Sequence, residues 1–214
     1  MKIALFDYGA GNLHSLGKAL EAGGARVTVT SRWSEALALD ALVLPGVGAF
    51  GAAVKSLGTE RARVRDALEG GLPCLGICLG MQLFFHDSAE GEGEGIGFLS
   101  GTVRRLRTHI VPQMGWNDVN ACLTTSSERK ADSPDPLFAG LEELVAYFAN
   151  SYVCQPTEPG TVIATSTYQG DRFPAAVHKV NTWGVQFHPE KSSGPGLRLI
   201  SNFLREARSH GGVS

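Results

Sequence analysis

The stretch that decides the fold of this chain is Leu72-Pro73-Cys74-Leu75-Gly76-Ile77-Cys78-Leu79-Gly80-Met81-Gln82. The apolar run before Cys78 predicts a short buried strand, and the residues after it predict the start of a helix. Glycines two positions before and after the cysteine permit a tight bend and a close approach of neighbouring strands and a substrate. The helix dipole would hold a thiol at this bend as thiolate. Buried free cysteines are commonly inert, but this context favours a nucleophile.

The composition is that of a globular enzyme. The 214 residues are 43% hydrophobic and 19% charged, with a formal net charge of −2. A chain of this length can bury the core of one domain, and we expect a single domain over residues 1–214. The weak charge and the lack of a long basic run argue against a nucleic-acid or membrane partner. No apolar stretch is long enough to span a bilayer.

The compartment can be predicted from the N-terminus and the cysteines. The N-terminus lacks the apolar run and cleavage site of a secretory signal. The four cysteines show no metal-type spacing, and a disulfide framework is improbable in a chain of this size without an export signal. We therefore expect a cytoplasmic protein with no metal.

Strand-like and helix-like segments alternate through the first ninety residues. Apolar runs predict strands at Lys2–Phe6, Val27–Val29, Ala41–Leu44 and Cys74–Ile77, and helical periodicity predicts helices at Asn12–Ala22 and Arg61–Leu68. Strands separated by helices indicate right-handed crossovers and a mainly parallel sheet with both faces covered.

The pattern changes after Gly91. The Glu-Gly repeat at 90–95 predicts a surface loop, and the polar segment Thr124–Pro136 predicts a mobile excursion. Further strands are expected at Thr102–Leu106, Val145–Phe148, Thr161–Thr167 and Ala175–Lys179, with a hairpin at Asn181-Thr182 and a last helix over Gly196–Arg208. The fold class is thus α/β, with a mainly parallel central sheet flanked by helices and an antiparallel extension in the C-terminal half.

His188 is the histidine best placed to serve Cys78 as a base. It ends an apolar run, and Glu190 follows two residues later. Residues i and i+2 of an extended strand point to the same side, so Glu190 could hold one ring nitrogen while the other faces the thiol. Alone, His188 could equally be a half-buried structural histidine. Zinc binding is weakly indicated, because no second histidine lies at helical spacing.

A tetrahedral intermediate on the thiol would need hydrogen-bond donors for its oxyanion. The backbone N–H of Leu79 is one candidate. The segment Pro45–Gly48 could supply another through Val47 or Gly48, although alone it reads as an ordinary turn. Gln82 lies one helical turn after Cys78 and could contact the substrate or simply be solvated. The remaining histidines, at positions 14, 86, 109, 178 and 210, have no comparable context and are expected to be surface or structural.

The Cys78 bend, together with the distant His188-Pro189-Glu190, resembles the triad class (class I) of glutamine amidotransferases. Within that class, four segments are similar to the glutaminase subunit of imidazole glycerol phosphate synthase: Asp7–Leu13, Pro45–Phe50, Pro112–Asn117 and Gly184–Ser192. The similarity spans essentially the whole chain and implies a flavodoxin-like sheet. One position departs from it: Asn150 stands where the family usually has histidine before Ser151-Tyr152.

The resemblance implies roles for individual residues. Cys78 would be the nucleophile, His188 the acid and base, and Glu190 its orienter. Val47 and Leu79 would form the oxyanion hole. The residues implied to hold glutamine are Gly48, Gln82, Glu90, Ser151 and Tyr152, with Glu90 facing the α-ammonium. No cofactor is implied.

The resemblance also implies a partner. Glutamine would be hydrolysed through a thioester, and the ammonia would pass to a (β/α)₈-barrel cyclase subunit in a heterodimer that serves histidine biosynthesis. Three alternatives remain open. The chain could serve another synthase, such as those for pyridoxal phosphate, anthranilate or guanylate. It could be a binding or regulatory subunit that has lost its chemistry, or a cysteine hydrolase or stress protein on the same sheet.

Overall fold

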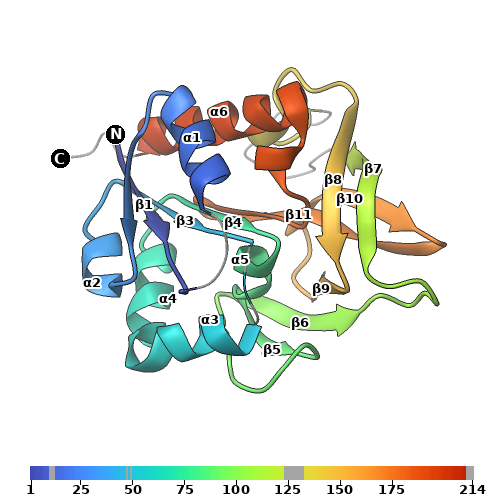
Figure 1. Cartoon of the computed structure of the whole chain (residues 1–214), viewed down its shortest axis with the longest axis horizontal. Coiled ribbons are helices and arrows are strands. Elements are labelled where there is room, and N and C mark those ends of the chain that lie inside the picture. The colour runs from blue at the N-terminus through green and yellow to red at the C-terminus, as the bar shows by residue number, and fades with distance from the viewer. Residues whose placement is uncertain (10–12, 47, 49, 123–132, 211–214) are drawn as a thin grey trace.

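A nine-stranded sheet forms the centre of the computed structural model, which describes residues 1–9, 13–46, 48, 50–122 and 133–210. The strand order is β2-β1-β3-β4-β12-β11-β10-β7-β8 (Figure 1). The first five strands pair in parallel, and the strands from β12 to β8 pair antiparallel. The α/β class with an antiparallel extension is therefore confirmed.

The elements have the following bounds. The parallel half contains β1 (Lys2–Phe6), β2 (Arg26–Thr30), β3 (Ala41–Leu44), β4 (Cys74–Ile77) and β12 (Thr182–Val185). The antiparallel half contains β11 (Asp171–Lys179), β10 (Val162–Tyr168), β7 (Gln113–Ala121) and β8 (Leu144–Asn150). A smaller sheet contains β5 (Phe85–Ser88), β6 (Leu99–Arg105) and β9 (Tyr152–Pro156). The α-helices are α1 (His14–Ala22), α2 (Trp33–Ala36), α3 (Phe50–Leu57), α4 (Arg61–Glu69), α5 (Leu79–Gln82) and α6 (Ser193–His210), with 3₁₀ turns η1 (Gly58–Glu60), η2 (Pro136–Phe138) and η3 (Pro189–Lys191).

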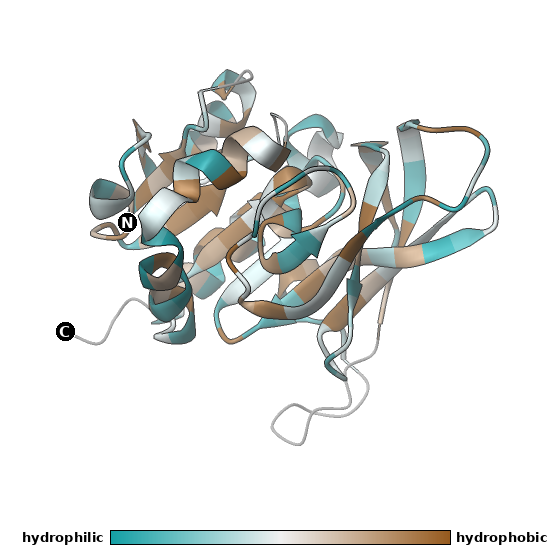
Figure 2. Ribbon diagram, turned by 90° about the horizontal axis from the view of Figure 1, so that it is seen from below, coloured by the Kyte–Doolittle hydropathy of each residue, from teal (hydrophilic) through white to brown (hydrophobic). Residues whose placement is uncertain are grey.

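Helices cover both faces of the parallel half, with α1 and α6 on one face and α2 to α5 on the other (Figure 1). Two clusters of buried side chains correspond to these faces, one including Leu16 of α1 and Phe203 of α6, the other Trp33 of α2 and Val64 of α4. Figure 2 shows hydrophobic residues concentrated in the strands of this sheet. Burial on both sides explains why β1, β3 and β4 are continuous apolar runs rather than alternating ones.

The helices take their positions from amphipathic spacing. The buried residues of α1 are Leu16, Ala19 and Leu20, at helical intervals that place them on one face. The longer α6 repeats this pattern with Leu199, Phe203 and Ala207, and its packing beside α1 closes one layer. Within the described ranges, no helix is both long and apolar enough to cross a membrane.

Several elements were not expected from the sequence. They are α2, α3, β5, β7 and β9. The strand β7 reads QMGWNDVNA, in which only Gln113 and Val119 are buried, so it carries little of the apolar alternation that predicts strands. It is held instead by seven paired positions with β8. The short α2 has four residues, too few for a periodic signal.

The predicted excursion over Thr124–Pro136 lies largely outside the described residues, and in its described part Ser133 and Pro134 are exposed whereas Asp135 is not. Asp135 is fully buried. Its carboxylate accepts hydrogen bonds from the backbone N–H of Leu137 at 3.0 Å and from Trp183 Nε1 at 3.1 Å. It also lies 2.7 Å from Nδ1 of His178, whose ring stacks on Trp183. The expectation of a mobile surface segment is therefore wrong for Asp135, whose buried carboxylate anchors η2 to β11 and β12.

Candidate active site

Cys78 occupies the turn between β4 and α5. Its backbone has φ 48° and ψ −103°, a conformation that residues with a side chain rarely adopt. The flanking glycines are needed for space. A Cβ on Gly76 would lie 2.7 Å from the carbonyl oxygen of Gly80, and one on Gly80 would lie 2.7 Å from the carbonyl carbon of Leu44. The strand, bend and helix predicted around Cys78 are thus present, with the unusual φ at the cysteine itself.

His188 reaches Cys78 because β12 lies beside β4. The two strands pair in parallel with Val185 opposite Ile77, and the Cys78 N–H donates to the carbonyl of Val185 at 2.6 Å. The chain then continues to His188, whose side chain is 4% exposed. Parallel pairing of strands more than a hundred residues apart therefore brings the thiol and the imidazole to the same edge of the sheet.

Glu190 contacts His188 as expected, but by a different route. Its Oε1 lies 2.9 Å from His188 Nδ1, and its side chain is 8% exposed. The prediction that an extended strand brings His188 and Glu190 together is wrong, because β12 ends at Val185 and Glu190 lies in the 3₁₀ turn η3. The tight turn after Pro189 folds the carboxylate back onto the ring.

The surroundings of His188 favour its protonated form. Burial lowers its pKa, but hydrogen bonds to Cys78 and Glu190, with the charges of both groups, outweigh burial and raise the pKa to about 9. A proton leaving the thiol thus has an acceptor on the adjacent imidazole. The result is a base held by a carboxylate next to a nucleophile, which is the arrangement that acyl transfer through a thioester requires.

A pocket of about 270 Å³ opens beside the thiol. Seven of the predicted site residues line it: Gly48, Cys78, Leu79, Gln82, Glu90, Ser151 and Tyr152. His188 and Glu190 are not among its lining residues, and Val47 lies outside the described residues. The lining residues that the sequence reasoning did not assign are Gly46, Pro112, Met114, Ala149 and Asn150. Pro112 and Met114 belong to one of the segments quoted for the family resemblance, which was the available signal.

Two pocket residues are fixed by the same carbonyl group. The Tyr152 carbonyl oxygen accepts from Gln82 Nε2 at 3.3 Å and from Asn150 Nδ2 at 3.1 Å. Gln82 is only 3% exposed, which rules out a solvated surface role. Because a carbonyl can only accept, both amides must turn their nitrogens toward it, and their oxygens are left to face other groups.

Glu90 also lines the pocket and is partly buried. Burial raises the pKa of its carboxyl group, although a hydrogen bond from the backbone of Phe50 opposes the effect. A carboxylate that has lost part of its hydration is stabilised by a cation, and an α-ammonium group would supply one.

Gly46 brings the turn after β3 against the reacting groups. A Cβ at this position would lie 2.8 Å from Cε1 of His188 and 2.9 Å from Cβ of Cys78. The backbone of Gly46 is therefore within reach of a substrate bound at the thiol.

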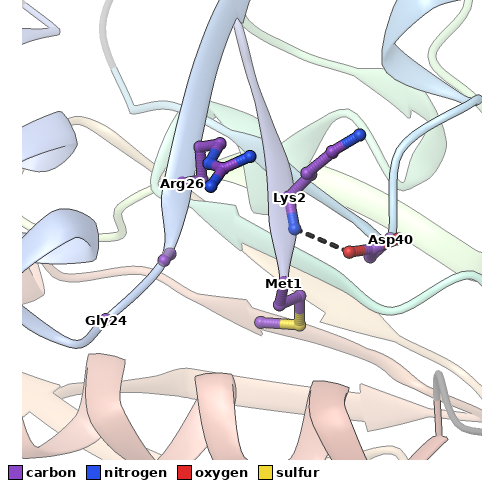
Figure 3. Close-up of a pocket in the computed structure, with 6 residues that line it drawn as sticks. Met1, Lys2, Gly24, Arg26 and Asp40 are labelled. Carbon is purple, nitrogen blue, oxygen red and sulfur yellow. Dashed lines mark hydrogen bonds between the residues drawn. The ribbon is translucent and has the colours of Figure 1, made fainter.

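A second hollow, of about 490 Å³, lies elsewhere and has a different character. Figure 3 shows it between the first residues of β1 and β2, with the Lys2 N–H donating to Asp40 at 2.6 Å. These residues stand at the amino ends of parallel strands, whereas ligands of open α/β sheets bind at the carboxyl ends, where Cys78 lies. The hollow therefore does not compete with the pocket at Cys78 as the candidate active site.

Comparisons with known proteins agree with this geometry. The family model "Glutamine amidotransferase class-I" matches residues 4–207. The imidazole glycerol phosphate synthase subunit HisH of Trichormus variabilis is 40% identical over 211 residues, covering 96% of each chain. The same subunit of Nostoc punctiforme is 42% identical over 212 residues, again covering 96% of each. A crystal structure of a glutamine amidotransferase superposes with TM-score 0.73 at 21% identity, covering 96% of this chain and 99% of that one, which supports the fold. The chain belongs to the class-I glutamine amidotransferase family, among the HisH subunits of imidazole glycerol phosphate synthase.

Proposed function

We propose that this chain is the glutaminase subunit of imidazole glycerol phosphate synthase. It hydrolyses glutamine to glutamate and ammonia, and passes the ammonia to a cyclase subunit for histidine biosynthesis in the cytoplasm. The chain acts as a single domain over residues 1–214. The observation that carries the proposal is a buried His188–Glu190 pair at 2.9 Å next to a thiol that lines an amino-acid-sized pocket.

The triad residues take the following roles. Cys78 gives its proton to His188, and the thiolate attacks the side-chain amide carbon of glutamine. His188 returns the proton to the amide nitrogen as the carbon–nitrogen bond breaks, so ammonia leaves and a γ-glutamyl thioester remains. Water, deprotonated by His188, then attacks the thioester and releases glutamate and the thiol. Glu190 keeps the ring oriented and stabilises the imidazolium in both steps.

The oxyanion of each tetrahedral intermediate requires donors at the thiol. Leu79 is the first residue of α5, follows Cys78 and lines the pocket. We assign its backbone N–H as one donor, with the N–H of Val47 as the other, on the strength of the family resemblance. Losing one such donor typically lowers the rate by about a hundred- to a thousandfold.

The remaining pocket residues bind the substrate. Glu90 pairs with the α-ammonium, while Gly48, Gln82, Ser151 and Tyr152 contact the rest of the molecule. The volume of about 270 Å³ supports a small substrate, because pockets for drug-sized ligands run from about 300 to 1,000 Å³. A free amino acid fits this size better than a peptide chain does.

The cyclase subunit docks at the mouth of this pocket. Met114 lines the pocket and is 62% exposed, and Trp116, two residues along β7 and 55% exposed, stands on the same face. Large exposed apolar side chains that cluster mark interaction surfaces. A partner with a (β/α)₈ barrel seated here would receive ammonia directly. Direct transfer matters because ammonia in neutral water is mostly protonated and then no longer nucleophilic.

The test is ammonia release from glutamine by the wild type and by Cys78→Ala, each with and without the cyclase. We expect release by the wild type in the complex and none by the variant. Cys122→Ala is the matched control, because that half-buried cysteine is outside the pocket, and it should behave like the wild type. Release that survives Cys78→Ala would refute the mechanism, and isolation of the chain with a different synthase would refute the partner.

A further inference from the structure

Gln186 is a buried polar residue that the proposed mechanism does not use. Its side chain is 0% exposed, and its Nε2 lies 3.5 Å from the sulfur of Cys78. Its Oε1 is also buried and contacts no hydrogen-bond donor among the described residues. A buried side-chain amide whose oxygen accepts no hydrogen bond destabilises the fold, so the position of Gln186 requires an explanation.

The sheet fixes Gln186 beside the thiol. Val185 accepts the Cys78 N–H, and the next N–H, that of Gln186, donates to Ala175 of β11 at 2.9 Å. Gln186 and His188 are two residues apart, and the residue between them, Phe187, packs against Phe148. Gln186 and His188 both contact the Cys78 side chain, each through a side-chain hydrogen bond.

We infer that Gln186 donates a hydrogen bond from Nε2 to the thiolate of Cys78 and so stabilises the nucleophile after its proton has moved to His188. The inference rests on the proposed function only for the identity of the reaction. The ionisation of the Cys78 sulfur does not depend on it. An anion in an apolar interior needs donors, and hydrogen bonds to charged groups are roughly twice as strong as neutral ones.

The other groups facing the sulfur do not replace this donor. His188 carries the proton that has left the thiol, and Glu190 contacts Nδ1 of His188. The Ala149 carbonyl, 4.0 Å from the sulfur, can only accept. Cys154 of β9 is buried, and burial and the charge of Cys78 both raise its pKa, so it stays neutral. Glu90, which lines the same pocket, is an acceptor when ionised. The neutral Cys154 thiol is at most a weak donor, so among these groups Gln186 is the one that adds an amide N–H.

The test measures alkylation of Cys78 by iodoacetamide as a function of pH, in the full chain carrying Cys122→Ser so that the half-buried thiol at position 122 does not react. The variants are Gln186→Met, which removes the donor, and Gln186→Glu, which keeps the shape and replaces the donor by a carboxylate. The control is Thr182→Val, which removes a buried, unpaired hydroxyl from β12 away from the sulfur.

We expect both Gln186 variants to slow alkylation at neutral pH by about tenfold to a hundredfold, and to move the half-maximal rate to higher pH. Gln186→Glu should be the slower of the two, because its charge repels the thiolate. Thr182→Val should match its parent. In the glutaminase assay of the complex, kcat should fall while KM changes little, because the bond is made to the nucleophile rather than to glutamine.

Unchanged alkylation profiles in both Gln186 variants would overturn the inference, as would an equal shift in Thr182→Val. If Gln186→Met does not fold, the isosteric Gln186→Glu decides the question. The outcome is separable from the proposed function. A chain that releases no ammonia from glutamine, but whose alkylation still depends on Gln186, would refute the function and keep the inference.

Discussion

Raising the pH should weaken the fold through His188. Its imidazolium is buried between Cys78 and Glu190, and although burial lowers its pKa, these two groups raise it to about 9 from an ordinary 6.5. The folded protein therefore binds this proton more tightly than the unfolded chain does. The stabilisation is fully present below pH 6.5 and is lost as the pH rises through about 9.

The size of the effect follows from the two values. A pKa of 6.5 in the unfolded chain and about 9 in the folded protein corresponds to about 3 kcal/mol, since each unit is worth about 1.4 kcal/mol. Replacing His188 by glutamine removes this contribution. The difference in unfolding free energy between wild type and His188→Gln should thus shrink by about 3 kcal/mol from about pH 6 to about pH 9.5.

The measurement is urea unfolding of both proteins across this pH range. Burial also raises the pKa values of Tyr8, Cys74 and Cys154. These groups affect both proteins equally at alkaline pH, so their effect cancels when the unfolding free energy of His188→Gln is subtracted from that of the wild type. His109→Gln, at an exposed histidine, is the control and should show no such trend. Parallel curves for wild type and His188→Gln would refute the picture of a buried imidazolium.

Three further changes test other parts of the structure. Gly46→Ala should lower kcat/KM by about a hundredfold, because its Cβ would stand 2.8 Å from the imidazole and displacements near 1 Å have such effects. Gly51→Ala in α3, with no atom within 4 Å of the new Cβ, should keep its activity, and equal losses in the two glutaminase assays would contradict the steric argument. Glu190→Gln should lower kcat in the same assay far more than it changes KM, since the carboxylate contacts the imidazole, and a change confined to KM would count against an orienting role. Asp171→Asn should cost about 2 kcal/mol in urea unfolding, because this carboxylate accepts from Arg104 at 2.7 and 2.9 Å with little exposure, and an unchanged midpoint would show that the pair is not stabilising.

The local sequence determined the elements of the parallel half. Continuous apolar runs of four residues correctly marked β1, β3 and β4, because strands buried on both faces must be apolar throughout. The two glycines around Cys78 likewise marked its bend. The polar strand β7 was missed because its stability comes from pairing with β8 rather than from its own pattern, and α2 because four residues are too few for a helical period.

The candidate site, too, was determined partly by the local sequence and partly by the tertiary structure. The sequence alone selected Cys78, His188 and Glu190 as a set, because thiol chemistry needs a base and an orienter. Only the tertiary structure decided how they meet: parallel pairing of β4 with β12 aligns the cysteine with the histidine, and a 3₁₀ turn returns the carboxylate. It also placed Gln186 against the sulfur. Residue type records what a side chain can do, whereas distance across a sheet depends on strand order and register, which no local pattern contains.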